Sequence, residues 1–219
     1  VPEIDAVLFD LGVSSMQIDQ TDRGFSYARP APLDMRMDTT AALTAEEVLN
    51  TYPQSELARV LWEYGEERFA RRIARQIVQR RPLQTSTDLV AAVEAGVPAG
   101  ARRKGHPAKR TFQAIRIEVN AELRSLEQAV PVALRRLRLG GRFIALSYHS
   151  LEDKMIKQAL RGGSQSTAPP DLPVIPPDSR PWLRLITRGS EVASDTEVAA
   201  NPRARSVRLR AAEKVREAS

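Results

Sequence analysis

The distribution of apolar and polar positions predicts two buried strands with a long helical region between them. Residues 4–9 are mostly apolar and lead into Asp10 and a turn of small residues, and residues 142–149 repeat this pattern. Short apolar runs of this kind are typical of strands in a parallel sheet that is covered on both faces. Because nothing before residue 4 can pair with the first strand, we expect the chain to start in the middle of a fold.

Helical periodicity dominates the region after the first strand. Apolar residues recur at helical spacing in residues 57–64 and 69–77, and the second of these helices is predicted to start at residues 66–67, which are both glutamate. Thr85 and Asp88 have the spacing of an N-cap pair and predict a short helix that extends to residue 94.

Two further helices are predicted before the second strand. Apolar residues form a stripe over 112–126, which predicts a long helix. Pro131 suits the first position of another helix over residues 132–139, because proline needs no N–H there. The glycine pair at 140–141 is predicted to end that helix.

The part of the chain after the second strand contains a helix, a linker and two more strands. Ser150 and Asp153 are spaced as a capping box and predict a helix. Residues 162–181 are rich in Gly, Ser and Pro and read as a linker or loop. Apolar and polar residues alternate in 182–187 and in 206–211, which predicts an antiparallel ribbon.

This order of elements belongs to the α/β class. We expect the C-terminal half of a doubly wound, Rossmann-like sheet, formed by residues 1–21 and 121–219. Residues 22–120 are expected to form a helical domain that is inserted into this sheet domain.

Composition excludes several classes of protein and site. A chain of 219 residues can form one good core, or one core with a small satellite domain. No stretch reaches the ~18 apolar residues of a membrane span and no signal peptide is recognisable, so we expect a soluble, cytoplasmic protein. The absence of cysteine excludes disulfides and thiolate metal sites, and with two histidines no metal site is expected.

Positive charge is concentrated in residues 66–110, which hold 11 lysines and arginines against four acidic residues, while the whole chain carries +6. A concentrated positive face favours a polyanionic partner such as RNA, and a solvated helix face is the alternative interpretation. The cations that we expect to contact phosphate are Arg102, Arg103, Lys104, Lys109 and Arg110.

Asp10 and His149 are the first candidates for chemistry, because each follows a predicted parallel strand. The carboxyl ends of such strands open on the same edge of a sheet, so the two side chains could face one pocket. A strand-end aspartate can equally cap a helix or form a turn, and a single histidine is often structural. The residues alone leave both interpretations open.

Seven segments, in order along the chain, resemble the MraW family of ribosomal RNA small subunit methyltransferases. The resemblance covers essentially the whole chain. The segments are DLGVSSMQ at 10–17, RGFS at 23–26, PLDMRMD at 32–38, YGEERFARRIA at 64–74, HPAKRTFQAIRIEVNAEL at 106–123, SYHSLED at 147–153 and NPRARS at 201–206.

The resemblance implies a class I methyltransferase that transfers a methyl group from S-adenosylmethionine to the N4 amine of a cytidine in 16S ribosomal RNA. It implies that the inserted helical domain helps to hold this RNA, and it places Asp10 and Gln17 in the cofactor site. The reaction also needs a proton acceptor, for which the candidates are Asp10, Asp34, His149 and Asp153. The cytosine has to leave its stack, and aromatic residues that could receive it, each equally suited to the core, are Phe25, Tyr27 and Tyr148.

The chain departs from the family pattern in one major respect. Members have a glycine-rich loop after the first strand of their sheet, and this sequence has none in that place. We interpret the chain as lacking the N-terminal third of the family. We therefore expect it to bind S-adenosylmethionine weakly or not at all, to be inactive or weakly active by itself, to be marginally stable and to self-associate through an exposed strand edge. The competing function class is a non-catalytic RNA-binding protein derived from the same family.

Overall fold

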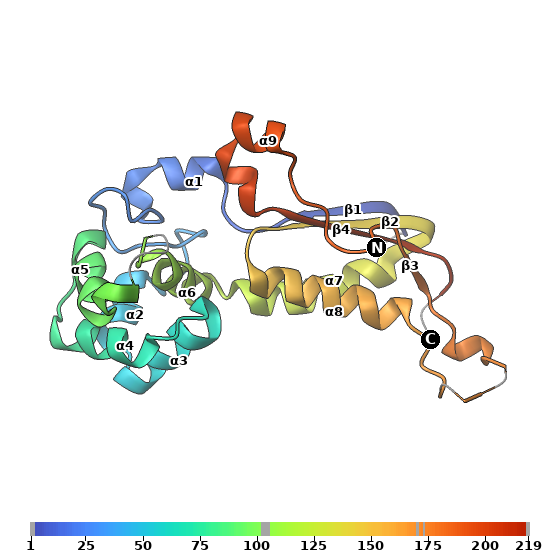
Figure 1. Ribbon diagram of the computed structural model, residues 1–219, viewed down its shortest axis with the longest axis horizontal. Helices are drawn as coiled ribbons and strands as arrows, with labels where there is room; N and C mark the ends of the chain where they lie inside the picture. The colour runs from blue at the N-terminus through green and yellow to red at the C-terminus, as the bar shows by residue number, and fades with distance from the viewer. Residues whose placement is uncertain (1–2, 102–105, 170, 173, 218–219) are drawn as a thin grey trace. The chain divides into compact units, whose positions relative to one another are not determined.

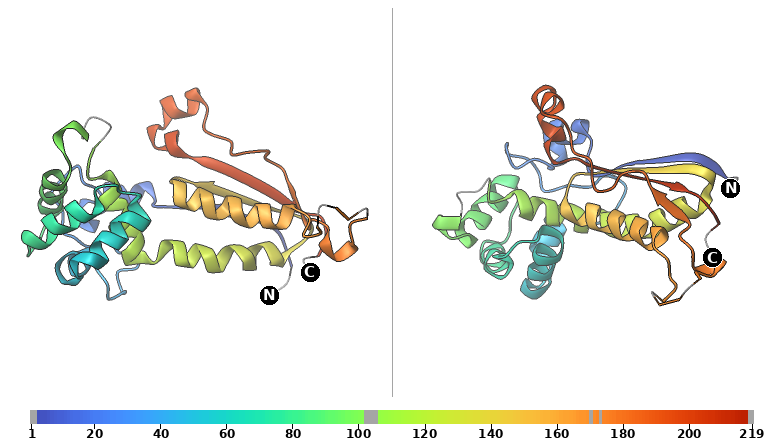
Figure 2. Two further views of the ribbon diagram at one scale, coloured as in Figure 1. Left: turned by 60° about the horizontal axis from the view of Figure 1, so that its bottom comes forward. Right: turned by 45° about the vertical axis from the view of Figure 1, so that its right-hand side comes forward.

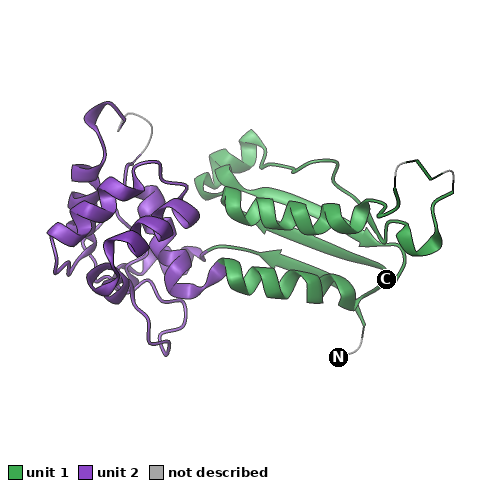
Figure 3. Ribbon diagram, turned by 90° about the horizontal axis from the view of Figure 1, so that it is seen from below, with its two compact units in different colours: residues 1–12, 123–219 green, residues 13–122 purple. Residues whose placement is uncertain are grey.

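The computed structural model describes residues 3–101, 106–169, 171–172 and 174–217, which form two compact units (Figure 3). The sheet unit consists of Val1–Gly12 and Leu123–Ser219, and the helical unit consists of Val13–Glu122. Residues 13–21 therefore belong with the helices, although the sequence assigned them to the sheet domain. No helix in the described ranges is long and apolar enough to cross a membrane.

The described strands of the sheet unit form one mixed sheet in the order β1, β2, β4, β3 (Figure 1). Strands β1 and β2 are parallel, whereas β4 is antiparallel to both β2 and β3. The α/β class and the antiparallel ribbon near the C-terminus are thus confirmed. The strand bounds are Ile4–Asp10 for β1, Leu137–Ser147 for β2, Leu183–Leu185 for β3 and Arg208–Lys214 for β4.

Helices α7 (Glu122–Arg136) and α8 (Ser150–Ser164) cover one face of this sheet (Figures 1 and 2). Phe143 and Ala145 of β2 point into that core and are buried, whereas Ile144 and the residues alternating with it are less buried. Among the described strands, β1 pairs with β2. Leu8 of β1 is 61% exposed. The unit also contains the short helices α9 (Asp195–Ala200), η3 (Pro177–Ser179) and η4 (Pro202–Ser206).

The helical unit has a separate core. Helices α3, α4 and α6 contribute half of its buried residues, among them Leu57, Ile73 and Ile115. Thr85 and Asp88 form the predicted capping box. The elements of the unit are α1 (Ser15–Asp19), η1 (Thr21–Arg23), α2 (Ala45–Thr51), α3 (Gln54–Gly65), α4 (Ala70–Gln79), α5 (Ser86–Gly96), η2 (Ala99–Ala101) and α6 (Lys109–Asn120).

The helix boundaries predicted around Pro131 and the glycine pair are wrong. Helix α6 ends at its C-cap Ala121, which has a φ of 47°. Helix α7 then begins at Glu122 and continues through Pro131 to Arg136. Burial of Val130 and Leu134 offsets the ~3 kcal/mol that proline costs inside a helix. Residues 140–141 lie in β2 at an irregularity opposite β1, where Gly140 has a φ of 77°.

Two predicted helix starts are also corrected. Helix α4 begins at Ala70 and not at residues 66–67, because Glu66 adopts the left-handed conformation, with a φ of 49°, that caps α3. Helix α8 is capped by His149, one residue earlier than predicted, and its partner in the capping box is Glu152. The sequence rule looks for a hydroxyl or carboxylate cap, and here an imidazole takes that place.

Candidate active site

The carboxyl ends of β1 and β2 bring Asp10 beside Tyr148. Asp10 pairs in register with Leu146, so the residues that follow β2 lie next to the end of β1. The Tyr148 hydroxyl donates a hydrogen bond of 3.0 Å to Asp10 Oδ1. The chain then turns at Gly12, where a φ of 82° favours glycine and a side chain would meet the Tyr148 ring.

The environment of this pair fixes the protonation of the tyrosine. Burial raises the pKa of the Tyr148 hydroxyl, and the hydrogen bond to the Asp10 carboxylate raises it further. Tyr148 is therefore a neutral donor at physiological pH. Asp10 itself is exposed, and its Oδ2 has no hydrogen bond within the described residues, so it can accept one from a ligand.

His149 is engaged in the turn that starts α8. Its Nδ1 accepts a hydrogen bond from the Glu152 N–H at 3.4 Å, and its Nε2 lies 3.2 Å from Glu152 Oε1. The Glu152 carboxylate accepts from the backbone N–H groups of Tyr148 (2.8 Å) and His149 (3.2 Å). Glu152 thus shapes the turn that presents Tyr148. Its position three residues after His149 is the signal that could have identified it.

Asp153, a second candidate proton acceptor, is held in a buried ion pair. Arg210 of β4 donates from Nε to Asp153 Oδ1 at 2.7 Å and from Nη2 to Oδ2 at 3.0 Å. Both side chains are 12% exposed, and the guanidinium of Arg208 lies 3.9 Å from the same carboxylate. This pair joins α8 to β4, so the geometry gives Asp153 a structural role.

Asp34 lies in the helical unit and is paired with Arg36. The two side chains form a double hydrogen bond with both distances at 2.9 Å, and this pairing holds the pKa of the Asp34 carboxyl below its usual range. The surrounding loop is tied down from two sides. Arg23 donates to the carbonyls of Arg36 and Met37, and Asn120 of α6 bonds the backbone of the same loop.

Gln17, the second residue implied for the cofactor, caps its own helix. Its side-chain oxygen accepts from the Ser14 N–H at 2.9 Å, and the Ser14 hydroxyl accepts from the Gln17 N–H at 3.2 Å. The Gln17 amide nitrogen has no hydrogen-bond partner within the described parts of the chain. It keeps two N–H donors for a ligand.

The predicted RNA contacts are only partly visible. Lys109 and Arg110 are exposed at the start of α6, where Arg110 donates to the Glu66 carbonyl at 3.0 Å. Arg102, Arg103 and Lys104 lie outside the described residues. Two of the three aromatic candidates for base stacking, Phe25 and Tyr27, pack against the helical core, and Tyr27 also stacks on His106 with centroids 4.4 Å apart.

Comparison with known proteins gives concordant matches over the whole chain. The model of the MraW methylase family matches residues 1–215. A ribosomal RNA small subunit methyltransferase H from Parafrankia sp. (strain EAN1pec) is 61% identical over 218 residues, which is 98% of this chain and 67% of the relative. The protein of the same name from Saccharopolyspora erythraea is 60% identical over 220 residues, and that from Frankia casuarinae is 59% identical over 217. These alignments cover 99% and 97% of this chain and 67% and 68% of the relatives, so the chain spans about two thirds of their length.

Proposed function

The chain belongs to the MraW methylase family, and from that premise we propose that it transfers a methyl group from S-adenosylmethionine to the N4 amine of a cytidine in small-subunit ribosomal RNA. The names of its relatives support this RNA as the substrate class. The observation that carries the proposal is the exposed carboxylate of Asp10, which Tyr148 holds at the carboxyl end of the parallel pair β1 and β2.

The side chains at this strand end fit S-adenosylmethionine. Its hydroxyl and amino groups are hydrogen-bond donors, and Asp10 Oδ2 is an open acceptor within the described structure. Gln17 stays a predicted contact, through its amide nitrogen. When bound, the cofactor would supply an electrophilic methyl group on a positively charged sulfur.

The target amine needs alignment and an acceptor for its proton. Its lone pair is delocalised into the ring, so a group that accepts a hydrogen bond from N4 makes it a better nucleophile. In the transfer the N4–C bond forms, the S–C bond breaks with its electron pair left on sulfur, and N4 loses a proton.

Of the four candidate acceptors, Asp10 is the most available. Asp153 and Asp34 are each held by an arginine at both oxygens. Both ring nitrogens of His149 lie within 3.4 Å of Glu152 atoms. We therefore propose Asp10 as the hydrogen-bond acceptor for the amine or for the cofactor, with Tyr148 as a positioning residue.

The reaction is tested by incubating the protein with small ribosomal subunits, or with their RNA, and S-adenosylmethionine that carries a labelled methyl group. Digestion to nucleosides and mass spectrometry identify the product, which is expected to be N4-methylcytidine. A labelled methyl group on an atom other than N4 of cytidine would contradict the proposed specificity. RNA binding without any transfer would favour the non-catalytic binding protein.

The role of Asp10 is tested with Asp10→Asn, using Asp5→Asn on the same strand as the matched control. Calorimetry gives the cofactor Kd, and single-turnover assays give the transfer rate. If Asp10 holds the cofactor, the Kd rises. If Asp10 aligns the amine, the rate falls about 100-fold or more while the Kd is unchanged. Tyr148→Phe should show a smaller change of the same kind. An Asp10→Asn protein that matches Asp5→Asn in both measurements would exclude either role.

We also propose that the helical unit contacts RNA phosphates through Arg102, Arg103, Lys104, Lys109 and Arg110. Exposure of Lys109 and Arg110 supports this. Neutralising all five should weaken RNA binding and flatten its salt dependence. An unchanged salt slope would assign these side chains to a solvated surface.

A further inference from the structure

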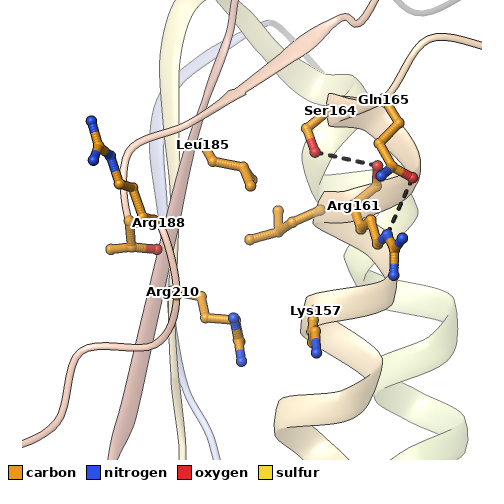
Figure 4. A pocket seen from close by; sticks show the side chains of 10 residues that line it. Lys157, Arg161, Ser164, Gln165, Leu185, Arg188 and Arg210 are labelled. Atoms are coloured by element: carbon orange, nitrogen blue, oxygen red, sulfur yellow. Dashed lines mark hydrogen bonds between the residues drawn. The ribbon is translucent and has the colours of Figure 1, made fainter.

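The sheet unit contains a groove between α8 and the segment that follows β3 (Figure 4). Its volume is about 310 Å³. Leu160 on α8 and Thr187 beyond β3 line it and are buried. None of the residues predicted for chemistry or RNA binding lines this groove. The lining residues are Lys157, Leu160, Arg161, Ser164, Gln165, Leu185, Thr187, Arg188, Gly189 and Arg210.

The groove is strongly basic. Four of its ten lining residues are Lys or Arg, and none is acidic. Arg210 is neutralised by Asp153, whereas Lys157 and Arg188 have no ion pair within the described residues. Arg161 bonds the uncharged side chain of Gln165 through Nε at 3.2 Å, so its charge is not compensated there.

The uncompensated cations are exposed and lie on two sides of the groove. Lys157 and Arg161 project from successive turns of α8, and Arg188 lies on the opposite side with its guanidinium turned away from the helix (Figure 4). Residues four positions apart on a helix are separated by about 6 Å along its axis. Two cations at this spacing, with a third on the opposite side of the groove, suit a chain of phosphates better than one small anion.

We propose that this groove binds the phosphodiester backbone of RNA. Arginine offers a planar pair of N–H donors to phosphate oxygens and lysine a point charge, which is the chemistry that backbone binding requires. The groove lining includes no aromatic side chain on which a base could stack, so the contact does not depend on sequence. The inference rests on the proposed function for the identity of the polyanion, and it adds a second RNA contact outside the helical unit.

The test compares two triple variants with equal loss of charge. The groove variant is Lys157→Ala, Arg161→Ala and Arg188→Ala. The control removes one lysine and two arginines that are exposed in the same unit but do not line the groove, with Lys154→Ala, Arg124→Ala and Arg142→Ala. Anisotropy of a labelled small-subunit RNA fragment, titrated at several KCl concentrations, gives the Kd and its salt slope for each protein. Thermal melting confirms that both variants fold.

For single strands, each phosphate contact that is lost makes the negative slope of log K against log salt shallower by about 0.7. Loss of three contacts should therefore make the slope shallower by about 2 and weaken binding up to about 100-fold at 0.1 M salt. The control variant should keep the wild-type slope. The conservative variant Arg161→Lys with Arg188→Lys should also keep it, because the charges remain.

Each other outcome overturns a defined part of the reasoning. Equal losses in groove and control variants would show that only net charge matters. Displacement of RNA by inorganic phosphate at matched ionic strength would show a site for single anions instead of a backbone. If the wild-type protein methylates RNA and the groove variant binds RNA with an unchanged Kd and salt slope, the groove proposal is refuted and the proposed function is not. A wild-type protein that neither binds nor methylates RNA would refute the groove and the proposed function together.

Discussion

Replacing Arg210 with alanine should strongly destabilise the sheet unit. The change leaves the carboxylate of Asp153, a residue that is 8% exposed, without its main partner. Removing one member of a buried ion pair typically costs about 3–5 kcal/mol. Arg208 lies 3.9 Å from the same carboxylate and is 52% exposed, so it can move toward the vacated site. We therefore expect a loss near the lower limit, about 3 kcal/mol, out of the roughly 5–15 kcal/mol that stabilises a domain.

The apolar double variant distinguishes the net contribution of the ion pair to stability from the loss of stability that follows when only one partner is removed. Asp153→Leu with Arg210→Met removes both charges and keeps much of the volume. Buried ion pairs replaced by packed apolar residues are often neutral in stability or better, so this variant should lie within about 1 kcal/mol of the wild type. Each single variant should be clearly less stable than the double variant.

The assay has to report on one unit, because a chain with two units does not unfold in two states. The chain has two tryptophans, of which Trp62 lies in the helical unit and Trp182 packs against the core of the sheet unit. Trp62 is 63% exposed, so Trp62→Phe should have little effect on stability. In that background, Trp182 fluorescence during urea unfolding follows the sheet unit alone.

A loss of less than 1 kcal/mol for Arg210→Ala, or single and double variants that are equally unstable, would refute this account of the pair. The same proteins decide between a structural and a chemical role for Asp153. A double variant that is stable and still transfers methyl groups excludes Asp153 as the proton acceptor. A double variant that is stable but has no methyl-transfer activity would keep Asp153 as a candidate proton acceptor.

Three further predictions concern the helical unit. Asn120→Ala should cost about 2–3 kcal/mol, because the Asn120 amide accepts from the Met37 N–H and donates to the Met35 carbonyl, and loss of helical circular dichroism in urea measures this. Gly96→Ala should cost about 1–3 kcal/mol, since its Cβ would lie 2.8 Å from the Ile73 backbone, whereas Gly100→Ala, which meets nothing within 4 Å, should be neutral in the same assay. Asp34 should stabilise the unit fully above the ordinary carboxyl pKa, near pH 4, and this stabilisation should be lost as the pH falls through its lowered pKa. Asp34→Asn should remove that part of the acid dependence, and urea midpoints between pH 6 and pH 2 that run parallel in both proteins would contradict the assignment.

Features set by neighbouring residues could be predicted from the sequence. Thr85 and Asp88 form the expected cap, because both partners lie within one turn. The strands after the linker pair as expected, because alternation marks the face that each strand buries. The helix boundary at Ala121 was missed, since alanine carries no breaking signal, and only the structure shows its left-handed conformation and the bonds from its N–H to the carbonyls of Ile117 and Glu118.

The sequence by itself determined the α/β class, the insertion of a helical region and the position of Asp10 after a strand, because these depend on periodicity and on local turn chemistry. Only the tertiary structure shows which partners the candidate site residues have. Asp153 meets Arg210 across 57 positions, and Tyr148 meets Asp10 across 138. Such contacts depend on how strands and helices pack in space. The pattern along the chain predicted that the ends of β1 and β2 lie at one edge, but it did not specify which side chains form pairs there.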